Sequence, residues 1–159
     1  IQLLRIIPHL SLIPLLIILI GIGESAKISL VAIGVMFPIY INTYQGITTA
    51  NPELLEMGHA YGLSKRDLFT RIIFPGALPN ILMGVRYALG VMWTTLIVAE
   101  TISSSSGLGY MATNAQEFMR MDTVLLCILI YALLGKVSDL IAKSLERVFL
   151  SWRQGGVEA

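Results

Sequence analysis

The chain has 159 residues, of which 55% are hydrophobic and only 13% are charged, and its mean hydropathy is +0.77. A soluble domain has about 25% charged residues, so this composition excludes an ordinary soluble enzyme and a disordered chain. A net charge of +1 excludes a strong attraction for nucleic acid, and the single cysteine, Cys127, excludes an internal disulfide. The composition therefore predicts one domain that is integral to a membrane.

The first half of the chain contains two apolar stretches of membrane-spanning length. Residues 6–23 form a run of 18 without Asp, Glu, Lys or Arg, which is about 27 Å long as a helix. Pro14 lies inside this run and predicts a kink. Residues 28–52 form a second run, of 25, with Pro38 near its middle. Because the chain begins at Ile1 without a basic segment, we expect a piece of a longer protein rather than a secretory signal.

The next segment is polar and predicts two short helices outside the membrane. Asn51-Pro52-Glu53 is typical of a helix start, and Gly62 is typical of the residue that follows a helix end. Ser64 is expected to cap a second short helix over 65–73, and Pro75 is expected to end it.

The second half of the chain predicts two further spans and the orientation of all of them. The third span runs from 79 to about 103 and the fourth from 123 to about 148, with a short interfacial helix between them over 110–122. Placing 53–86 on the cytoplasmic side leaves eight Lys or Arg residues on that side and two on the other, with Lys136 ambiguous, as the positive-inside rule favours. The sequence thus predicts an all-α polytopic membrane bundle with about four spans and two short cytoplasmic helices.

A motif lies in the polar segment. Its string Glu56-Met57-Gly58-His59-Ala60-Tyr61-Gly62 is followed, after nine residues, by Ile72-Ile73-Phe74-Pro75. It resembles the Glu-Ala-Ala loop of permease subunits of bacterial ATP-binding-cassette importers, in which an acid, two small residues and a glycine precede Ile-x-Leu-Pro. Glu56, Gly62, Ile72 and Pro75 match this pattern, and Gly58 keeps its position small. Met57 and Phe74 depart from the pattern but are still apolar.

Further strings extend the resemblance over nearly the whole chain, among them Phe37-Pro38-Ile39-Tyr40 and Ile97-Val98-Ala99-Glu100-Thr101. They are similar to the aliphatic sulfonate, taurine and nitrate branch of these permeases, and most similar to its aliphatic sulfonate members. The resemblance implies a transmembrane domain over 1–153, without the first two of about six spans, and a tail over 154–159. It also implies a homodimeric permease in the bacterial inner membrane that works with ATPase subunits and an extracytoplasmic binding protein.

The chain has no Gly-x-x-x-x-Gly-Lys-Ser/Thr loop for ATP phosphates, so we expect no cofactor of its own and no enzymatic activity. Energy for transport would therefore come through a partner or from an ion gradient, and the resemblance implies that the partner is an ATPase. An amphipathic helix suits docking in a groove of such a partner, with Leu55, Met57, Tyr61 and Leu63 buried there. The expected docking residues are Glu56, Met57, Gly58, Ala60, Tyr61, Gly62, Ile72 and Pro75.

Three polar residues of the third span are candidates for a pathway or gate: Glu100, Thr94 and Arg86. A charge at the bilayer centre costs about 2.5–3.5 kcal/mol on insertion scales, so such residues usually face a bundle or a cavity. The simpler interpretations are an interfacial position for Glu100, a snorkelling Arg86, and a hydrogen bond from Thr94 to its own helix. His9 and His59 have no second ligand at helical spacing, so no metal site is predicted.

Two other classes of function stay open at this stage. In a carrier driven by an ion gradient, Glu100 and Arg86 would be the coupling groups, and the polar helices would have no docking role. A membrane anchor without transport activity would gain nothing from prolines within its spans. Among substrates, taurine, nitrate and bicarbonate stay open beside an aliphatic sulfonate.

Overall fold

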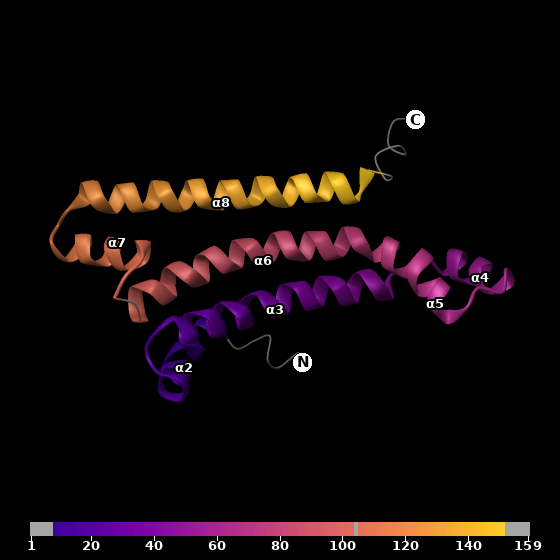
Figure 1. Cartoon of the computed structure of the whole chain (residues 1–159), viewed down its shortest axis with the longest axis horizontal. Coiled ribbons are helices and arrows are strands. Elements are labelled where there is room, and N and C mark those ends of the chain that lie inside the picture. Colours follow the sequence, from indigo (N-terminus) through magenta and orange to yellow (C-terminus); the bar gives the residue numbers. More distant parts are fainter. Residues whose placement is uncertain (1–7, 104, 152–159) are drawn as a thin grey trace. The chain divides into compact units, whose positions relative to one another are not determined.

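The computed structural model describes residues 8–103 and 105–151, and every regular element in these two ranges is a helix (Figure 1). This confirms the predicted all-α class. The predicted tail, 154–159, lies outside the described residues. In chain order the elements are the 3₁₀ helix η1 (His9–Leu12), α2 (Ile13–Ile20), α3 (Glu24–Thr48), α4 (Pro52–Ala60), α5 (Lys65–Leu68), the π-helix η2 (Phe69–Ile73), α6 (Phe74–Ser103), α7 (Leu108–Glu117) and α8 (Met121–Phe149).

Three helical stretches among the described residues are long and apolar enough to cross a bilayer. They are α3 with 25 residues, the continuous stretch Lys65–Ile102 with 38, and α8 with 29. At about 1.5 Å per residue, each exceeds the ~30 Å thickness of the hydrocarbon core. They correspond to the second, third and fourth spans that the sequence predicts, and they fit a multi-pass membrane protein.

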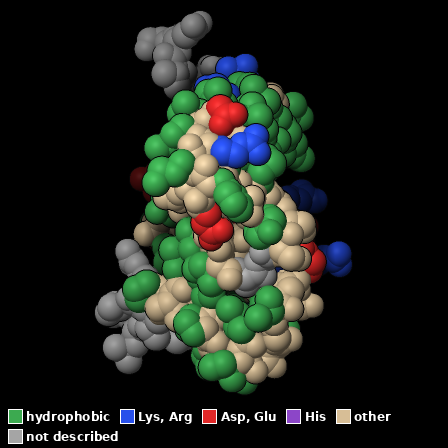
Figure 2. Space-filling model, turned by 90° about the vertical axis from the view of Figure 1, so that its left-hand side faces the viewer, with side chains coloured by type: hydrophobic (Ala, Val, Ile, Leu, Met, Phe, Trp, Pro, Cys, Tyr) green, Lys and Arg blue, Asp and Glu red, His purple; other side chains and the backbone are tan. Residues whose placement is uncertain are grey.

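Apolar side chains cover the outside of these helices. Only 6% of the most apolar window of α8 is buried. Leu125, Leu129 and Leu133, which lie one helical turn apart on α8, are all exposed. Figure 2 shows hydrophobic side chains over much of the face that it presents, with only a few separate charged groups. A surface of this kind is unfavourable in water and suited to lipid or to neighbouring helices.

The described part of the first predicted span, 6–23, holds a helical stretch that is too short to cross a bilayer. This stretch, His9–Ile20, is 3₁₀ in η1 and α-helical in α2, and it has fewer than the ~20 residues that a bilayer requires. Pro14 lies where η1 passes into α2, in the first turn of α2, a position that tolerates its missing N–H. Gly21 and Gly23, with φ of +91° and +151°, follow the helix end. The described residues therefore contain three candidate spans where the sequence predicted about four.

The prediction that Pro75 ends a helix is wrong, because α5, η2 and α6 follow one another without a break. The N–H of Phe74 donates to the carbonyl of Phe69, five residues earlier, which is the bond of a π-helix. In an α-helix the ring of Pro75 would clash with the carbonyl four residues before it. The wider π-turn directly before Pro75 gives this ring room, so the helix continues into the span.

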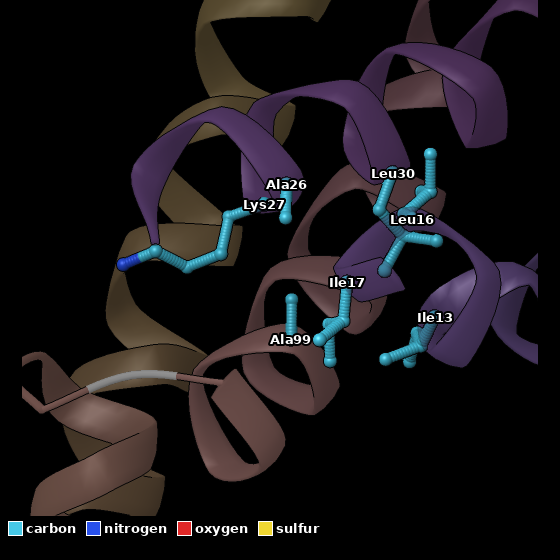
Figure 3. A pocket seen from close by; sticks show the side chains of 7 residues that line it. All are labelled: Ile13, Leu16, Ile17, Ala26, Lys27, Leu30 and Ala99. Atoms are coloured by element: carbon cyan, nitrogen blue, oxygen red, sulfur yellow. The ribbon is translucent and has the colours of Figure 1, made fainter. Parts of the chain in front are cut away.

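The chain forms two compact units, and the first comprises residues 1–37 and 88–139. Its core is Ile13 of α2, Leu30 of α3 and Ala99 of α6. Beside them is a small hollow lined by Ile13, Leu16, Ile17, Ala26, Lys27, Leu30 and Ala99 (Figure 3). The side chain of Lys27 is almost fully buried, but its nitrogen points away from the apolar side chains and pairs with the Glu24 carboxylate.

The second unit comprises residues 38–87 and 140–159. Within it, α3 and α6 approach each other closely at two glycines. A Cβ on Gly46 would lie 2.9 Å from the backbone oxygen of Ala77, and one on Gly84 would lie 2.7 Å from the Cβ of Asn42. Membrane helices associate largely through such close packing of small residues. The predicted docking residues, which lie in α4, in the turn after it, in η2 and at the start of α6, belong to the same unit.

Candidate functional site

Helix α4 begins at the signal present in the sequence. The side-chain oxygen of Asn51, the N-cap residue, accepts a hydrogen bond of 2.9 Å from the backbone N–H of Glu53. Pro52 occupies the first turn, where its missing N–H costs nothing. The carboxylate of Glu53 lies near the positive end of the helix dipole. The predicted start of this helix is therefore confirmed.

Helix α4 ends in a Schellman motif at Gly62. The N–H of Leu63 donates to the carbonyl of Gly58 at 3.0 Å, and the N–H of Gly62 donates to the carbonyl of His59 at 2.9 Å. Gly62 has φ +72°, a backbone conformation in which a side chain is strained. This confirms Gly62 as the residue that terminates the helix and turns the chain toward α5.

Gly58 is the point at which α4 packs on the next helices. It is buried, and a Cβ built on it would lie 2.9 Å from Cδ1 of Ile72, 3.1 Å from Cδ1 of Leu68 and 3.3 Å from Cδ1 of Leu63. Leu68 is only 8% exposed. Of the residues expected at the docking surface, Gly58, Leu63 and Ile72 therefore pack inward and hold α4 against α5 and η2.

The outer face of α4 has an apolar stripe that nothing covers among the described residues. It consists of Leu54, Met57 and Tyr61, at positions i, i+3 and i+7 on one side of the helix. Their exposed fractions are 44%, 49% and 81%. Glu56 and Ala60 are exposed beside them. This stripe, which we call the α4 face, combines a hydrophobic surface with a carboxylate at its edge.

Helix α5 is fixed at its start as the sequence predicts. The hydroxyl of Ser64 accepts the N–H of Asp67 at 3.2 Å and donates to the Asp67 carboxylate at 2.5 Å. The other carboxylate oxygen of Asp67 lies 3.5 Å from Nε of Arg71. These contacts fix the local conformation at the start of α5, which connects α4 to α6 through η2.

The three candidates for a pathway have different surroundings. The hydroxyl of Thr94 is exposed and donates to the carbonyl of Gly90 in its own helix at 3.2 Å, which is the simpler of the two interpretations for a span hydroxyl. Arg86 is exposed and belongs to the second unit, whereas Glu100 belongs to the first. Glu100 is half-buried and accepts hydrogen bonds from two other elements, from the N–H of Gly109 and from the hydroxyl of Tyr131.

Sequence reasoning missed a second polar contact in the first unit. Thr95, only 1% exposed, shares a hydrogen bond of 2.9 Å with Nε2 of His9. A Cβ on Gly34 of α3 would lie 3.1 Å from the His9 ring, so the absence of a side chain there makes room for the imidazole. Thr94 and Thr95 are adjacent in sequence, and only the register of α6 decides which of them is buried.

Comparison with known proteins gives a consistent result. Residues 1–150 match the family model described as the inner membrane component of binding-protein-dependent transport systems. Over 152 residues, 96% of this chain, it is 59% identical to a protein of Escherichia coli and 43% identical to a protein of Bacillus subtilis. Both relatives are named as aliphatic sulfonates transport permease proteins, and the alignments cover 58% and 55% of their lengths.

A further relative is named for a different substrate. The taurine transport system permease protein of Escherichia coli is 36% identical over 152 residues, which are 96% of this chain and 55% of that protein. The chain thus spans a little more than half the length of the curated relatives that it matches.

Proposed function

The chain belongs to the family of inner membrane components of binding-protein-dependent transport systems, and we propose that it is the permease subunit of an ATP-driven importer. In this proposal two copies of the permease work with two ATPase subunits and an extracytoplasmic binding protein that delivers a small anion. ATP is bound and hydrolysed by the ATPase subunits, and the permease contributes the path through the membrane and the surface that receives the motion.

The observation that carries the proposal is the α4 face with its anchorage. Leu54, Met57 and Tyr61 expose apolar surface along one side of α4, and exposed apolar stripes of this spacing are typical of helices that dock in a partner's groove. Glu56 at the edge of the stripe is exposed and suited to fix the register of docking through its charge.

The inner side of α4 supports a transmitting role. Gly58 lets Leu63, Leu68 and Ile72 pack directly against the α4 backbone, and α5 continues through η2 into α6 without a break. A displacement of α4 by a closing ATPase would therefore move the start of the α6 span with it. Conversion between inward-open and outward-open states through such rigid helical motion is a common form of switching.

Transport of an aliphatic sulfonate is the preferred substrate assignment. It is supported by the names of the two relatives at 59% and 43% identity, compared with 36% for the taurine permease. Taurine is itself a small sulfonate, so the choice between the two concerns the organic group rather than the anion. Screening the cognate binding protein against alkanesulfonates, taurine, nitrate and bicarbonate by calorimetry tests this assignment, and tight binding of nitrate or bicarbonate alone would refute it.

Reconstituted vesicles test the proposed function. The assembled transporter, with ATP inside and loaded binding protein outside, is expected to accumulate sulfonate, and a proton or sodium gradient without ATP is expected to give no uptake. Uptake driven by the gradient alone would establish the carrier instead.

A pair of methionine variants tests the docking surface in the same preparation. Met57→Asp places a charge in the α4 face and is expected to abolish co-purification of the ATPase subunit. Met119→Asp is the matched control, because Met119 is also an exposed methionine but lies outside α4. Equal loss of the ATPase subunit in both variants, or in neither, would contradict docking at the α4 face.

A further inference from the structure

One carboxylate joins three helices of the first unit. Glu100, close to the end of α6, accepts a hydrogen bond of 2.7 Å from the N–H of Gly109 and one of 2.8 Å from the hydroxyl of Tyr131. Gly109 lies in the first turn of α7, and Tyr131 lies in α8. The first-turn N–H groups of a helix have no partner within it, so Glu100 satisfies one of them and lies at the positive end of the α7 dipole.

The approach of Glu100 to α7 requires two glycines. A Cβ on Gly107 would lie 2.6 Å from the Glu100 carboxyl carbon, and one on Gly109 would lie 2.7 Å from the Cβ of Glu100 and 2.9 Å from the carbonyl oxygen of Ile97. Gly107 has φ +119°, which a residue with a side chain rarely adopts. A side chain at Gly109 would therefore push α7 away from the backbone of α6, and one at Gly107 would displace the Glu100 carboxylate.

The partner Tyr131 is itself held in place. Its ring packs edge-on against the ring of Trp93, with centroids 6.5 Å apart, and the indole N–H of Trp93 donates to the hydroxyl of Ser138 at 3.0 Å. Trp93 belongs to α6, and Ser138 belongs to α8. The hydroxyl that binds Glu100 is thus presented by an aromatic pair that connects the same two helices.

The position of Tyr131 along α8 shows how far α7 runs back beside that helix. Tyr131 is ten residues after Met121, where α8 begins, which corresponds to about 15 Å of helix. Helix α7 has ten residues and is therefore also about 15 Å long. Because a short turn joins α7 to α8 and the α7 N-terminus meets Glu100 beside Tyr131, α7 runs back along the first part of α8.

We propose that Glu100 is a positioning residue that holds α7 between α6 and α8. A half-buried carboxylate is costly unless charge-assisted hydrogen bonds compensate it, and the α7 N-terminus and Tyr131 supply two. Resting on the proposed function, the inference adds that transport depends on this position of α7. Loss of the carboxylate leaves the α7 N-terminus without its partner, so α7 loosens and the transport cycle slows.

Hydrogen exchange of the assembled transporter in lipid nanodiscs tests the positioning directly. Glu100→Ala is expected to raise the exchange of the first α7 amides about tenfold or more, as loss of a charge-assisted hydrogen bond implies. Exchange in α3 is expected to stay unchanged. Gly109→Ala is expected to act like Glu100→Ala, whereas the matched control Gly90→Ala, in α6 with no atom within 4 Å of the added Cβ, is expected to have no effect. Unchanged α7 exchange in Glu100→Ala, or an equal rise in α3, would overturn the proposal.

Uptake kinetics separate positioning from general damage. Glu100→Ala is expected to lower the maximal rate of ATP-driven uptake at least fivefold, with the half-saturating concentration of loaded binding protein within twofold of the unmodified transporter. Glu100→Gln, which keeps an acceptor oxygen, is expected to restore part of the rate. An unaltered rate in a variant with loosened α7 would overturn the dependence of transport on α7. A lack of ATP-driven uptake by the unmodified transporter would refute the proposed function, while α7 exchange would still decide the positioning.

Discussion

The replacement of Gly58 by leucine tests how α4 is held. The Cβ alone would come within 2.9, 3.1 and 3.3 Å of the terminal methyl groups of Ile72, Leu68 and Leu63. Those methyl groups can shift a few tenths of an ångström, and alanine gains about 1 kcal/mol of helix propensity over glycine, so we expect Gly58→Ala to be nearly neutral. The three further carbons of leucine have no such room, and overpacking of this kind costs about 1–3 kcal/mol.

The assay for this prediction is hydrogen exchange of α4 together with ATPase coupling. Gly58→Leu is expected to lower the free energy of opening α4 by about 1–3 kcal/mol and to reduce ATP-driven uptake, with membrane insertion intact. Gly76→Leu is the matched control, since Gly76 is also a helical glycine of the second unit but has no atom within 4 Å of an added Cβ. Normal α4 protection in Gly58→Leu would refute the packing argument.

Three further predictions concern charge and backbone strain. Glu56→Lys is expected to abolish ATP-driven uptake without affecting insertion, and normal uptake would contradict a docking role for Glu56. Gly62→Ala puts a side chain at φ +72° and is expected to destabilise the end of α4 by about 1–2 kcal/mol, measured by exchange of the Leu63 amide; equal exchange would contradict it. Met119 has φ +56° in the Schellman turn that ends α7, so Met119→Gly is expected to stabilise that turn by about 1 kcal/mol, and faster exchange of the Arg120 amide would disprove this.

Local signals in the sequence were sufficient for much of α4 and α5. Asn51, Gly62 and Ser64 each act on backbone groups two to five residues away, so their roles as caps follow from residue type and spacing. The long spans could also be predicted from the sequence, because a long run without charged residues is required by the bilayer itself and does not depend on tertiary contacts.

Two predictions from proline positions failed because the backbone around the proline differs from that of a regular α-helix. Pro75 is normally a helix terminator, but the π-turn before it removes the clash on which that rule rests. The long apolar run around Pro14 predicts a kink there, whereas the structure places Pro14 in the first turn of α2. In both cases the backbone hydrogen-bond pattern decides whether a helix begins, ends or continues at the proline, and hydropathy and residue type do not predict that pattern.

The environment of Glu100 was beyond sequence reasoning for another reason. Its partners are 9 and 31 residues away in the chain, and their meeting depends on how α7 folds back along α8. The pair Gly107 and Gly109 is the one feature of the sequence that could have indicated this contact. Two glycines on either side of the first residue of α7 allow the Glu100 side chain to approach that helix closely. The sequence identified Glu100 as unusual, but it did not indicate what the carboxylate binds.

Thiol labelling of the α4 face tests the central claim most directly. Met57→Cys in a Cys127→Ala background gives a single thiol at an exposed position, because Cys127 is the one cysteine of the native sequence. A membrane-impermeant reagent is expected to label this cysteine in inside-out vesicles but not in right-side-out vesicles, and bound ATPase subunits are expected to protect it. Labelling from the outer side, or an unchanged labelling rate with the ATPase bound, would contradict the account.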